Sequence, residues 1–147
     1  MEPLPSSLAL ELPFPPTINT YYTVARGRKI LSAKGRMYKQ MCILPPEARL
    51  LMQGDVSVTV MLEMPDKRKR DIDNYVKAVL DVLTDNGVYQ DDSQIKLLTV
   101  FHGGFTKGGR CEVEIESLAA KRALLKQNGK KNNIVLFPGM EPSDEQH

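Results

Sequence analysis

Cysteine, tryptophan and long apolar runs are scarce or missing in this chain of 147 residues, which has two cysteines and no tryptophan. Cys42 and Cys111 have no C-x-x-C spacing and are too few for a disulfide framework, so they fit a reducing compartment. No apolar run approaches the roughly 20 residues that cross a bilayer. The N-terminus has an acid where a secretory signal has cations, so we expect a cytoplasmic protein with no membrane partner.

A nucleotide-binding phosphate loop is also missing. The segment FTKGG lacks the G-K-[ST] order that cradles nucleotide phosphates, so we expect no nucleotide cofactor. This argues against a small-molecule phosphohydrolase. His102 is a lone histidine on a predicted strand, and we expect its role to be structural.

Acidic side chains are absent between Leu12 and Pro46, and gather instead from Asp71 to Asp92. The acid-free segment contains Arg26, Arg28, Lys29, Lys34, Arg36 and Lys39. A chain with one basic surface and one acidic focus can bind nucleic acid although its net charge is only +2. The alternative is a solvated surface of mixed charge.

The composition indicates one globular domain, because 26% of the residues are charged and 41% are hydrophobic, which excludes a wholly disordered chain. We assign residues 1–118 to this domain. Residues 119–147 form a C-terminal extension, for which we predict a short helix followed by a poorly ordered tail. Its apolar segment IVLFPGM docks either on this protein or on a partner.

The alternation and capping patterns predict an α+β fold, a small mixed β-sheet with helices packed on it. Strands are predicted at 7–12, in DVSVTVMLEMP, in QIKLLTVFHGG and in RCEVEIESL, the last two forming a hairpin through FTKGG. Helices are predicted from the N-cap Ser32 to about Leu44 and from Asn74 to about Thr84, with Gly87 as the C-cap. The segment TINTYYTVARGRKI shows no sustained period, so we predict an irregular loop there.

The segment KRKRDIDN carries the chemistry. Asp71 and Asp73 stand two residues apart, just before the second predicted helix, and carboxylates this close require a cation between them. Aspartate oxygens suit Mg²⁺, which takes one or two carboxylates, several waters and a substrate phosphate. The spacing therefore predicts a metal site.

A second acidic pair, Asp91 and Asp92, follows this helix. If the next strand returns beside the first, Asp71, Asp73 and one of the pair make a three-carboxylate cluster for phosphodiester hydrolysis. Lys77, one turn from Asp73, either offsets charge at the scissile phosphate or forms an i, i+4 ion pair worth about 0.2–0.5 kcal/mol.

The run Lys67, Arg68, Lys69 and Arg70 abuts these carboxylates. A lone run of cations is usually a solvated loop, but at this position it favours a phosphate clamp. Three aromatic residues, Tyr21, Tyr22 and Phe105, either stack on bases or take part in the core or a subunit contact.

The chain resembles the RusA family of Holliday junction resolvases. The resemblance rests on LPFPPTINTYYTVARGRKILSAKGRMYK, MPDKRKRDIDNYVKAVLDVLTDNGVYQDDSQI and TKGGRCEVEI, and covers roughly residues 10–117. Two departures are the prolines in ILPPEARLLMQG and the extension after Leu118, which inherits no function. The resemblance implies a bacterial or phage-encoded cytoplasmic endonuclease that uses Mg²⁺, or Mn²⁺ in its place, to resolve four-way junctions as a homodimer.

The resemblance also implies roles for individual residues. Asp71, Asp73 and Asp92 are expected to hold the metal, with Asp91 as a further acid and Lys77 assisting catalysis. DNA contacts are expected from Arg26, Arg28, Lys29, Lys67, Arg68, Lys69, Arg70, Lys107 and Arg110. The competing hypothesis is a non-cleaving module that binds branched DNA and whose acids only bridge its own arginines.

Overall fold

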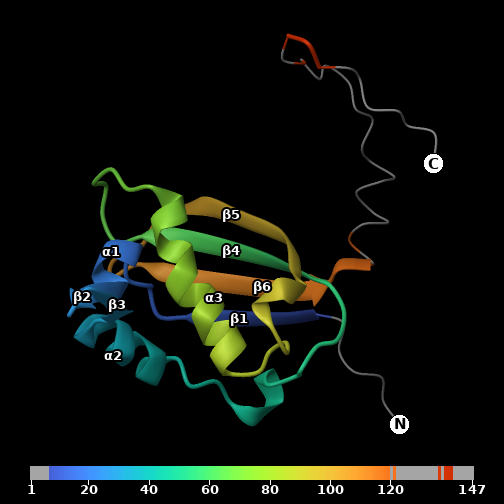
Figure 1. The fold of residues 1–147 in the computed structure, drawn as a ribbon, viewed down its shortest axis with the longest axis horizontal. Helices are drawn as coiled ribbons and strands as arrows, with labels where there is room; N and C mark the ends of the chain where they lie inside the picture. Colours follow the sequence, from blue (N-terminus) through green and yellow to red (C-terminus); the bar gives the residue numbers. More distant parts are fainter. Residues whose placement is uncertain (1–6, 120, 122–135, 137, 141–147) are drawn as a thin grey trace.

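A four-stranded sheet with helices on one face organises the computed structural model, which describes residues 7–119, 121, 136 and 138–140 (Figure 1). Its strands are β1 (Ser7–Leu12), β4 (Val56–Met64), β5 (Ile95–Phe105) and β6 (Arg110–Ser117), in the order β1-β6-β4-β5. Strand β5 runs parallel to β4, whereas β6 is antiparallel to both β1 and β4. The predicted α+β class with a mixed sheet is confirmed.

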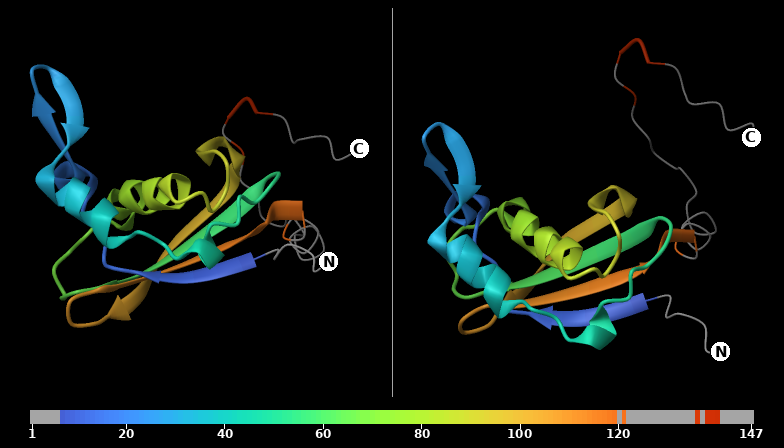
Figure 2. Two further views of the ribbon diagram at one scale, coloured as in Figure 1. Left: turned by 90° about the horizontal axis from the view of Figure 1, so that it is seen from below. Right: turned by 60° about the horizontal axis from the view of Figure 1, so that its bottom comes forward.

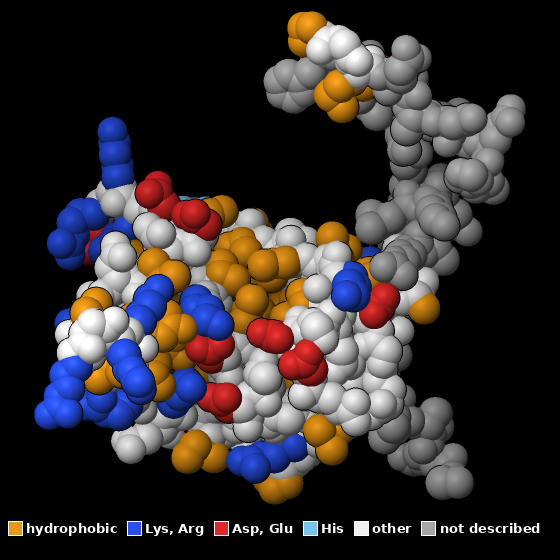
Figure 3. Space-filling view, in the orientation of Figure 1, with side chains coloured by type: hydrophobic (Ala, Val, Ile, Leu, Met, Phe, Trp, Pro, Cys, Tyr) orange, Lys and Arg blue, Asp and Glu red, His pale blue; other side chains and the backbone are white. Residues whose placement is uncertain are grey.

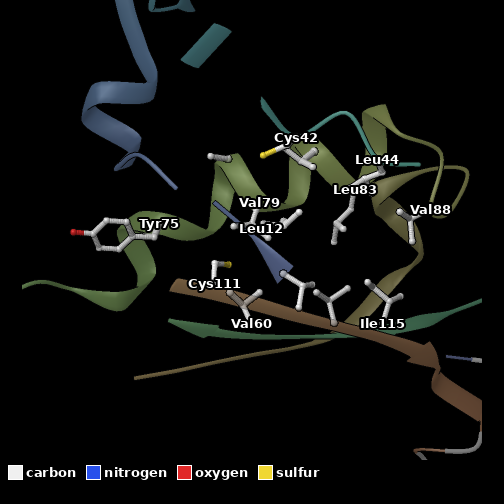
Figure 4. Packing of buried hydrophobic residues seen from close by; sticks show 14 of the residues in the cluster. Leu12, Cys42, Leu44, Val60, Tyr75, Val79, Leu83, Val88, Cys111 and Ile115 are labelled. Carbon is white, nitrogen blue, oxygen red and sulfur yellow. The ribbon is translucent and has the colours of Figure 1, made fainter. Parts of the chain in front are cut away.

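The core lies between this sheet and helix α3 (Val76–Asp85). Val56, Val58 and Val60 alternate along β4 and have no exposed surface, as expected for β-branched residues on the inner face of a central strand. Val79 and Leu83 of α3 point toward Val60 and Ile115 of the sheet (Figure 4). Each such side chain contributes about 1.5–3 kcal/mol when fully buried.

A 3₁₀ turn, η2 (Ile72–Tyr75), leads directly into α3, so the predicted helix from Asn74 to about Thr84 is confirmed and starts two residues earlier. Asn86 is the C-cap, and Gly87 follows it with a φ of +70°. The Asn86 side chain donates to the Val82 and Cys42 carbonyl oxygens and accepts from the Leu44 amide. The end of α3 is therefore tied to the segment that follows α2.

Helix α2 (Ala33–Met41) begins as predicted, because the Ser32 hydroxyl accepts from the Gly35 amide at 3.0 Å. It stops before the predicted Leu44, and Asn86 instead binds backbone groups of Cys42 and Leu44. A short 3₁₀ helix, η1 (Pro46–Ala48), follows at the prolines.

The predicted irregular loop after Pro16 is wrong. Its residues form α1 (Ile18–Tyr21) and a hairpin of β2 (Tyr22–Ala25) and β3 (Arg28–Leu31), which projects from the sheet (Figure 2). Arg26 and Gly27 make the turn with φ values of +52° and +72°, the signs that a type I′ turn requires. Strands of four residues are too short for their alternation to be detected in the sequence.

The predicted hairpin between the last two strands is also wrong, because β4 lies between β5 and β6. The turn that joins them passes the end of β4, where the Thr106 amide donates to the Met64 carbonyl oxygen at 2.9 Å. Gly109 approaches the Phe14 ring too closely for a side chain, since a Cβ there would lie 2.7 Å from it.

The predicted C-terminal helix and tail lie almost wholly outside the described residues. Lys121 is described, and its ammonium pairs with Glu116 at 3.0 Å. Within the part of the chain that the structure describes, no helix is long and apolar enough to span a membrane.

We predict that Gly35→Ala destabilises the protein by about 1–3 kcal/mol, as expected for overpacking. A Cβ at Gly35 would lie 2.5 Å from the Tyr21 carbonyl oxygen, a backbone atom that cannot rotate away. Urea unfolding measures the change. Gln40→Ala, at an exposed position of the same helix, is the control and should stay within about 0.5 kcal/mol of wild type. Equal stability of Gly35→Ala and wild type would show that α1 and α2 can move apart.

Candidate active site

Asp71 and Asp73 lie at the start of the α3 segment, where the loop that leaves β4 turns into η2. Asp71 is the N-cap of η2 in an extended conformation, but its side chain makes no capping hydrogen bond. Both residues are exposed, and neither carboxylate makes a hydrogen bond or ion pair within the described residues. The two carboxylates are thus free to bind a ligand from solution.

Asp91 and Asp92 follow α3 in the chain, at the end of the helix opposite to Asp71 and Asp73 and directly before β5. Asp91 caps η3 (Asp92–Gln94): its carboxylate accepts from the Ser93 amide, and the Gln94 side chain accepts from the Asp91 amide at 2.8 Å. The hydrogen bonds from Ser93 lower the pKa of Asp91. Both aspartates are exposed, and Asp91 also caps η3.

One chain does not assemble the predicted three-carboxylate cluster. Strand β5 returns beside β4, as that hypothesis requires, but it returns parallel to it. The ten residues of α3, about 15 Å of helix, therefore separate the two acidic pairs. No group of three or more acidic, histidine or cysteine side chains in the described residues could hold a metal ion. Asp71 and Asp73 are together, and Asp92 is apart from them.

Lys77 is held by Asp81, one turn further along α3. Its ammonium lies 2.9 Å from Asp81 Oδ1, and the buried Tyr21 hydroxyl donates to Asp81 Oδ2 at 2.7 Å. The hydrogen bond to Asp81 raises the pKa of Lys77, and the charge of Asp92 adds to this. Lys77 thus stays protonated. An i, i+4 ion pair is present as predicted, with Asp81 as its partner. Tyr21 was not predicted in this role, since its distance in sequence hides the contact.

The basic run is divided by Asp66. The Asp66 carboxylate pairs with Arg70 at 2.5 Å and with Arg68 at 3.1 Å. Hydrogen bonds from Arg70 and Arg68 hold the pKa of Asp66 well below its usual range. Lys67 and Lys69 are exposed and make no ion pair within the described residues. The run therefore presents two free ammonium groups on a loop braced by its arginines.

The β2–β3 hairpin presents a second basic surface. Arg26, Arg28 and Lys29 are all exposed there, and the Lys29 ammonium lies 4.5 Å from the centre of the Tyr22 ring. Lysine and arginine side chains gather at the hairpin end of the molecule, beside acidic side chains (Figure 3).

The remaining two predicted DNA contacts differ from each other. Lys107 is exposed in the turn between β5 and β6. Arg110 is partly exposed, and its guanidinium forms ion pairs with Glu11, Glu63 and Glu112. Because its guanidinium is occupied by three carboxylates, Arg110 adds no net positive charge to the surface.

The free carboxylates of Asp71 and Asp73 fit a hard divalent cation. Both donors are oxygen, both are exposed, and their like charges favour a cation between them. Mg²⁺ keeps several waters and needs only one or two carboxylates from the protein. Asp71 and Asp73 therefore have the donor chemistry that such an ion requires from a protein.

The fold and site define a small α+β protein with a carboxylate pair flanked by basic segments. The family described as Endodeoxyribonuclease RusA matches residues 13–116. The chain is 36% identical over 116 residues to "Crossover junction endodeoxyribonuclease RusA" of Shigella sonnei (strain Ss046), covering 77% of this chain and 97% of the relative. It is 38% identical over 112 residues to the protein of the same name from Enterobacteria phage 82, covering 74% and 93%. The chain belongs to the RusA family.

We predict that Tyr21→Phe lowers the free energy of unfolding by about 1.5–3 kcal/mol, the usual contribution of a hydrogen bond to a charged group. The variant removes the donor to Asp81 and keeps the buried ring. Denaturant unfolding measures the loss. Tyr22→Phe is the matched control, because the Tyr22 hydroxyl makes no hydrogen bond within the described residues. If both variants lose equally, the bond to Asp81 does not stabilise the site.

Proposed function

We propose that this chain is a metal-dependent endodeoxyribonuclease that resolves four-way DNA junctions by hydrolysing phosphodiester bonds. The observation that carries the proposal is the free carboxylate pair, Asp71 and Asp73, directly after a loop with two exposed lysines. Relatives that are at least 36% identical and match this region carry the name crossover junction endodeoxyribonuclease.

The metal we propose is Mg²⁺, with Mn²⁺ able to replace it, held by Asp71 and Asp73. When bound, such an ion lowers the pKa of a coordinated water and polarises the phosphoryl oxygens. The two carboxylates orient the ion beside the basic loop. Carboxylates that bridged the protein's own arginines, as in a non-cleaving module, would be paired; Asp66 is paired in this way, whereas Asp71 and Asp73 are not.

Lys77 supplies a fixed positive charge near the scissile phosphate. Asp81 and Tyr21 hold its side chain, so the ammonium is oriented before DNA arrives. A preorganised charge stabilises the negative charge that develops on oxygen in the transition state and requires no rearrangement at that moment.

The DNA backbone contacts the hairpin and the loop before η2. The proposed contacts are Arg26, Arg28, Lys29, Lys67, Arg68, Lys69 and Lys107, each exposed. Each phosphate that they neutralise releases counterions, so affinity falls as salt rises. Arg70 braces the loop through Asp66, and the ion pairs of Arg110 remove it from the proposed surface.

A homodimer supplies Asp92. Since α3 separates Asp92 from Asp73 in one chain, Asp92 can act on the same metal only if it comes from a second copy. Two copies related by a two-fold axis, with their α3 helices antiparallel, bring the start of each α3 to the end of the other. This arrangement makes two identical sites, as paired nicks in a two-fold symmetric junction require.

We predict that Asp73→Asn abolishes junction cleavage and leaves junction binding intact. The rate should fall by at least about 100-fold, because loss of even an outer-sphere partner of a metal costs 10- to 100-fold. A denaturing gel of a synthetic four-way junction, with and without Mg²⁺, measures cleavage, and a mobility shift measures binding. Asp85→Asn, on the same helix but paired with Lys39, should cut normally. A cutting Asp73→Asn protein would refute the assignment of this residue.

A mixed dimer tests whether the site is shared. Asp73→Asn and Asp92→Asn homodimers should both be inactive, but a heterodimer of the two variants, isolated with two affinity tags, should nick one strand. In a shared arrangement, one of its two sites keeps both native aspartates. The heterodimer of wild type with Asp73→Asn is the positive control. An inactive heterodimer of the two variants would contradict the shared site, and an active monomeric wild type would contradict the dimer.

A further inference from the structure

Phe105, the last residue of β5, is 52% exposed and pairs with Met64, the residue from which the chain leaves β4 toward the proposed site. We propose that its ring is a stacking platform for an unstacked nucleobase of the DNA junction, next to the carboxylate pair. The inference rests on the proposed function and assigns to Phe105 a contact with a base of the DNA, in addition to the phosphate contacts proposed above.

A bulge in β5 directs Phe105 toward the α3 face of the sheet. Phe101 is paired with Met61, on the face away from α3, and strict alternation would put residue 105 on that same face. The register shifts by one residue where Leu62 pairs with His102 but Glu63 pairs with Gly104. Phe105 therefore pairs with Met64, whose side chain is in the core. A bulge of this kind re-aims side chains next to functional sites.

Gly103 permits the bulge. It is the residue left out of the pairing, and a Cβ on it would collide with the Met61 side chain. The extra residue can thus be accommodated only without a side chain, or with displacement of Met61. Because Gly103 permits the bulge, it also determines toward which face of the sheet the Phe105 ring points.

His102 supports the Phe105 ring. The two rings meet edge to face, with centres 5.1 Å apart and planes at 72°. His102 Nδ1 accepts from the Gly104 amide at 3.0 Å, which fixes the imidazole against the bulge. An edge-to-face contact with one neighbour covers at most one face of the Phe105 ring, and Phe105 is 52% exposed. An exposed aromatic face is what a base requires for stacking.

The charges around Phe105 favour a nucleic-acid ligand. The turn after Phe105 carries Lys107. In the same turn the Thr106 amide donates to the carbonyl oxygen of Met64, and the loop with Lys67 and Lys69 begins directly after Met64. An aromatic face between cations that bind phosphates is the general arrangement for single-stranded nucleic acid. Strand β5 is also an edge of the sheet, and no strand of the described residues covers this side.

The other aromatic candidates do not offer such a face. Tyr21 is fully buried and donates to Asp81. Tyr22 packs on Tyr21, and the Lys29 ammonium lies over its ring. Among the residues predicted to stack on bases, Phe105 is therefore the one whose ring is open to solvent.

The test is a double-mutant cycle between Phe105→Ala and an abasic nucleotide at the crossover, measured as junction affinity without divalent metal. Phe105→Ala should weaken binding to the intact junction by about 5- to 150-fold, the range for one stacked base. On the junction that lacks the stacked base, the variant and wild type should bind equally. Phe105→Tyr should retain affinity, and Phe105→Leu, which lacks a flat ring, should not.

Phe101→Ala is the matched control, because Phe101 is on the same strand and 47% exposed but faces the other side of the sheet. It should bind as wild type does. If wild type shows no preference for junction over linear duplex, the proposed function itself fails. If wild type prefers and cuts junctions, three results overturn only the stacking inference. The first is an unchanged junction affinity of Phe105→Ala, and the second is a loss of affinity by this variant that is equally large on intact and abasic junctions. The third is a Phe105→Ala protein that is monomeric by light scattering.

Discussion

The parallel pairing of β4 with β5 controls where the charged residues of this protein can lie. A parallel neighbour requires a crossover, and α3 is that crossover, packed on β4 through Val79 and Leu83. In this crossover, the N-terminus of α3 lies near the C-terminal end of β4, and the C-terminus of α3 lies near the N-terminal end of β5. The acidic pairs that flank α3 are therefore held at opposite ends of one rigid unit, and this separation makes a second subunit necessary for a three-carboxylate site.

The charged residues divide into those that are paired within the chain and those that remain free. Asp66 pairs with arginines, Asp81 with Lys77, and Arg110 with three glutamates. Asp71 and Asp73 make no such contact within the described residues. The unpaired carboxylates repel phosphate, whereas the unpaired lysines nearby attract it. A divalent cation bound to the carboxylates would neutralise their charge and remove this repulsion. The paired residues give this region its geometry, and the free ones give it its chemistry.

Several elements were predictable because their signals are local. Strand β4 was visible from the alternation of its valines, and the start of α2 from a single capping serine. The β2–β3 hairpin was missed because each strand has four residues, and its Arg-Gly turn is a weaker signal than Asn-Gly. The position of β6 between β1 and β4 was missed because strand order depends on contacts between distant residues, which no local pattern encodes.

The residue types of the site can be recognised from the sequence, since D-x-D before an amphipathic helix and a run of cations are readable in chain order. The sequence also identifies the family through those same residues. Which of these residues contact one another follows from the packing of the segments. In the folded chain, Asp92 lies the length of a helix away from Asp73, and Lys77 pairs with Asp81, which also accepts from Tyr21. Arg110 pairs with three glutamates, and Phe105 is on the α3 face of the sheet. Charge and hydrophobic period are properties of single segments, whereas contact and direction arise when the segments pack.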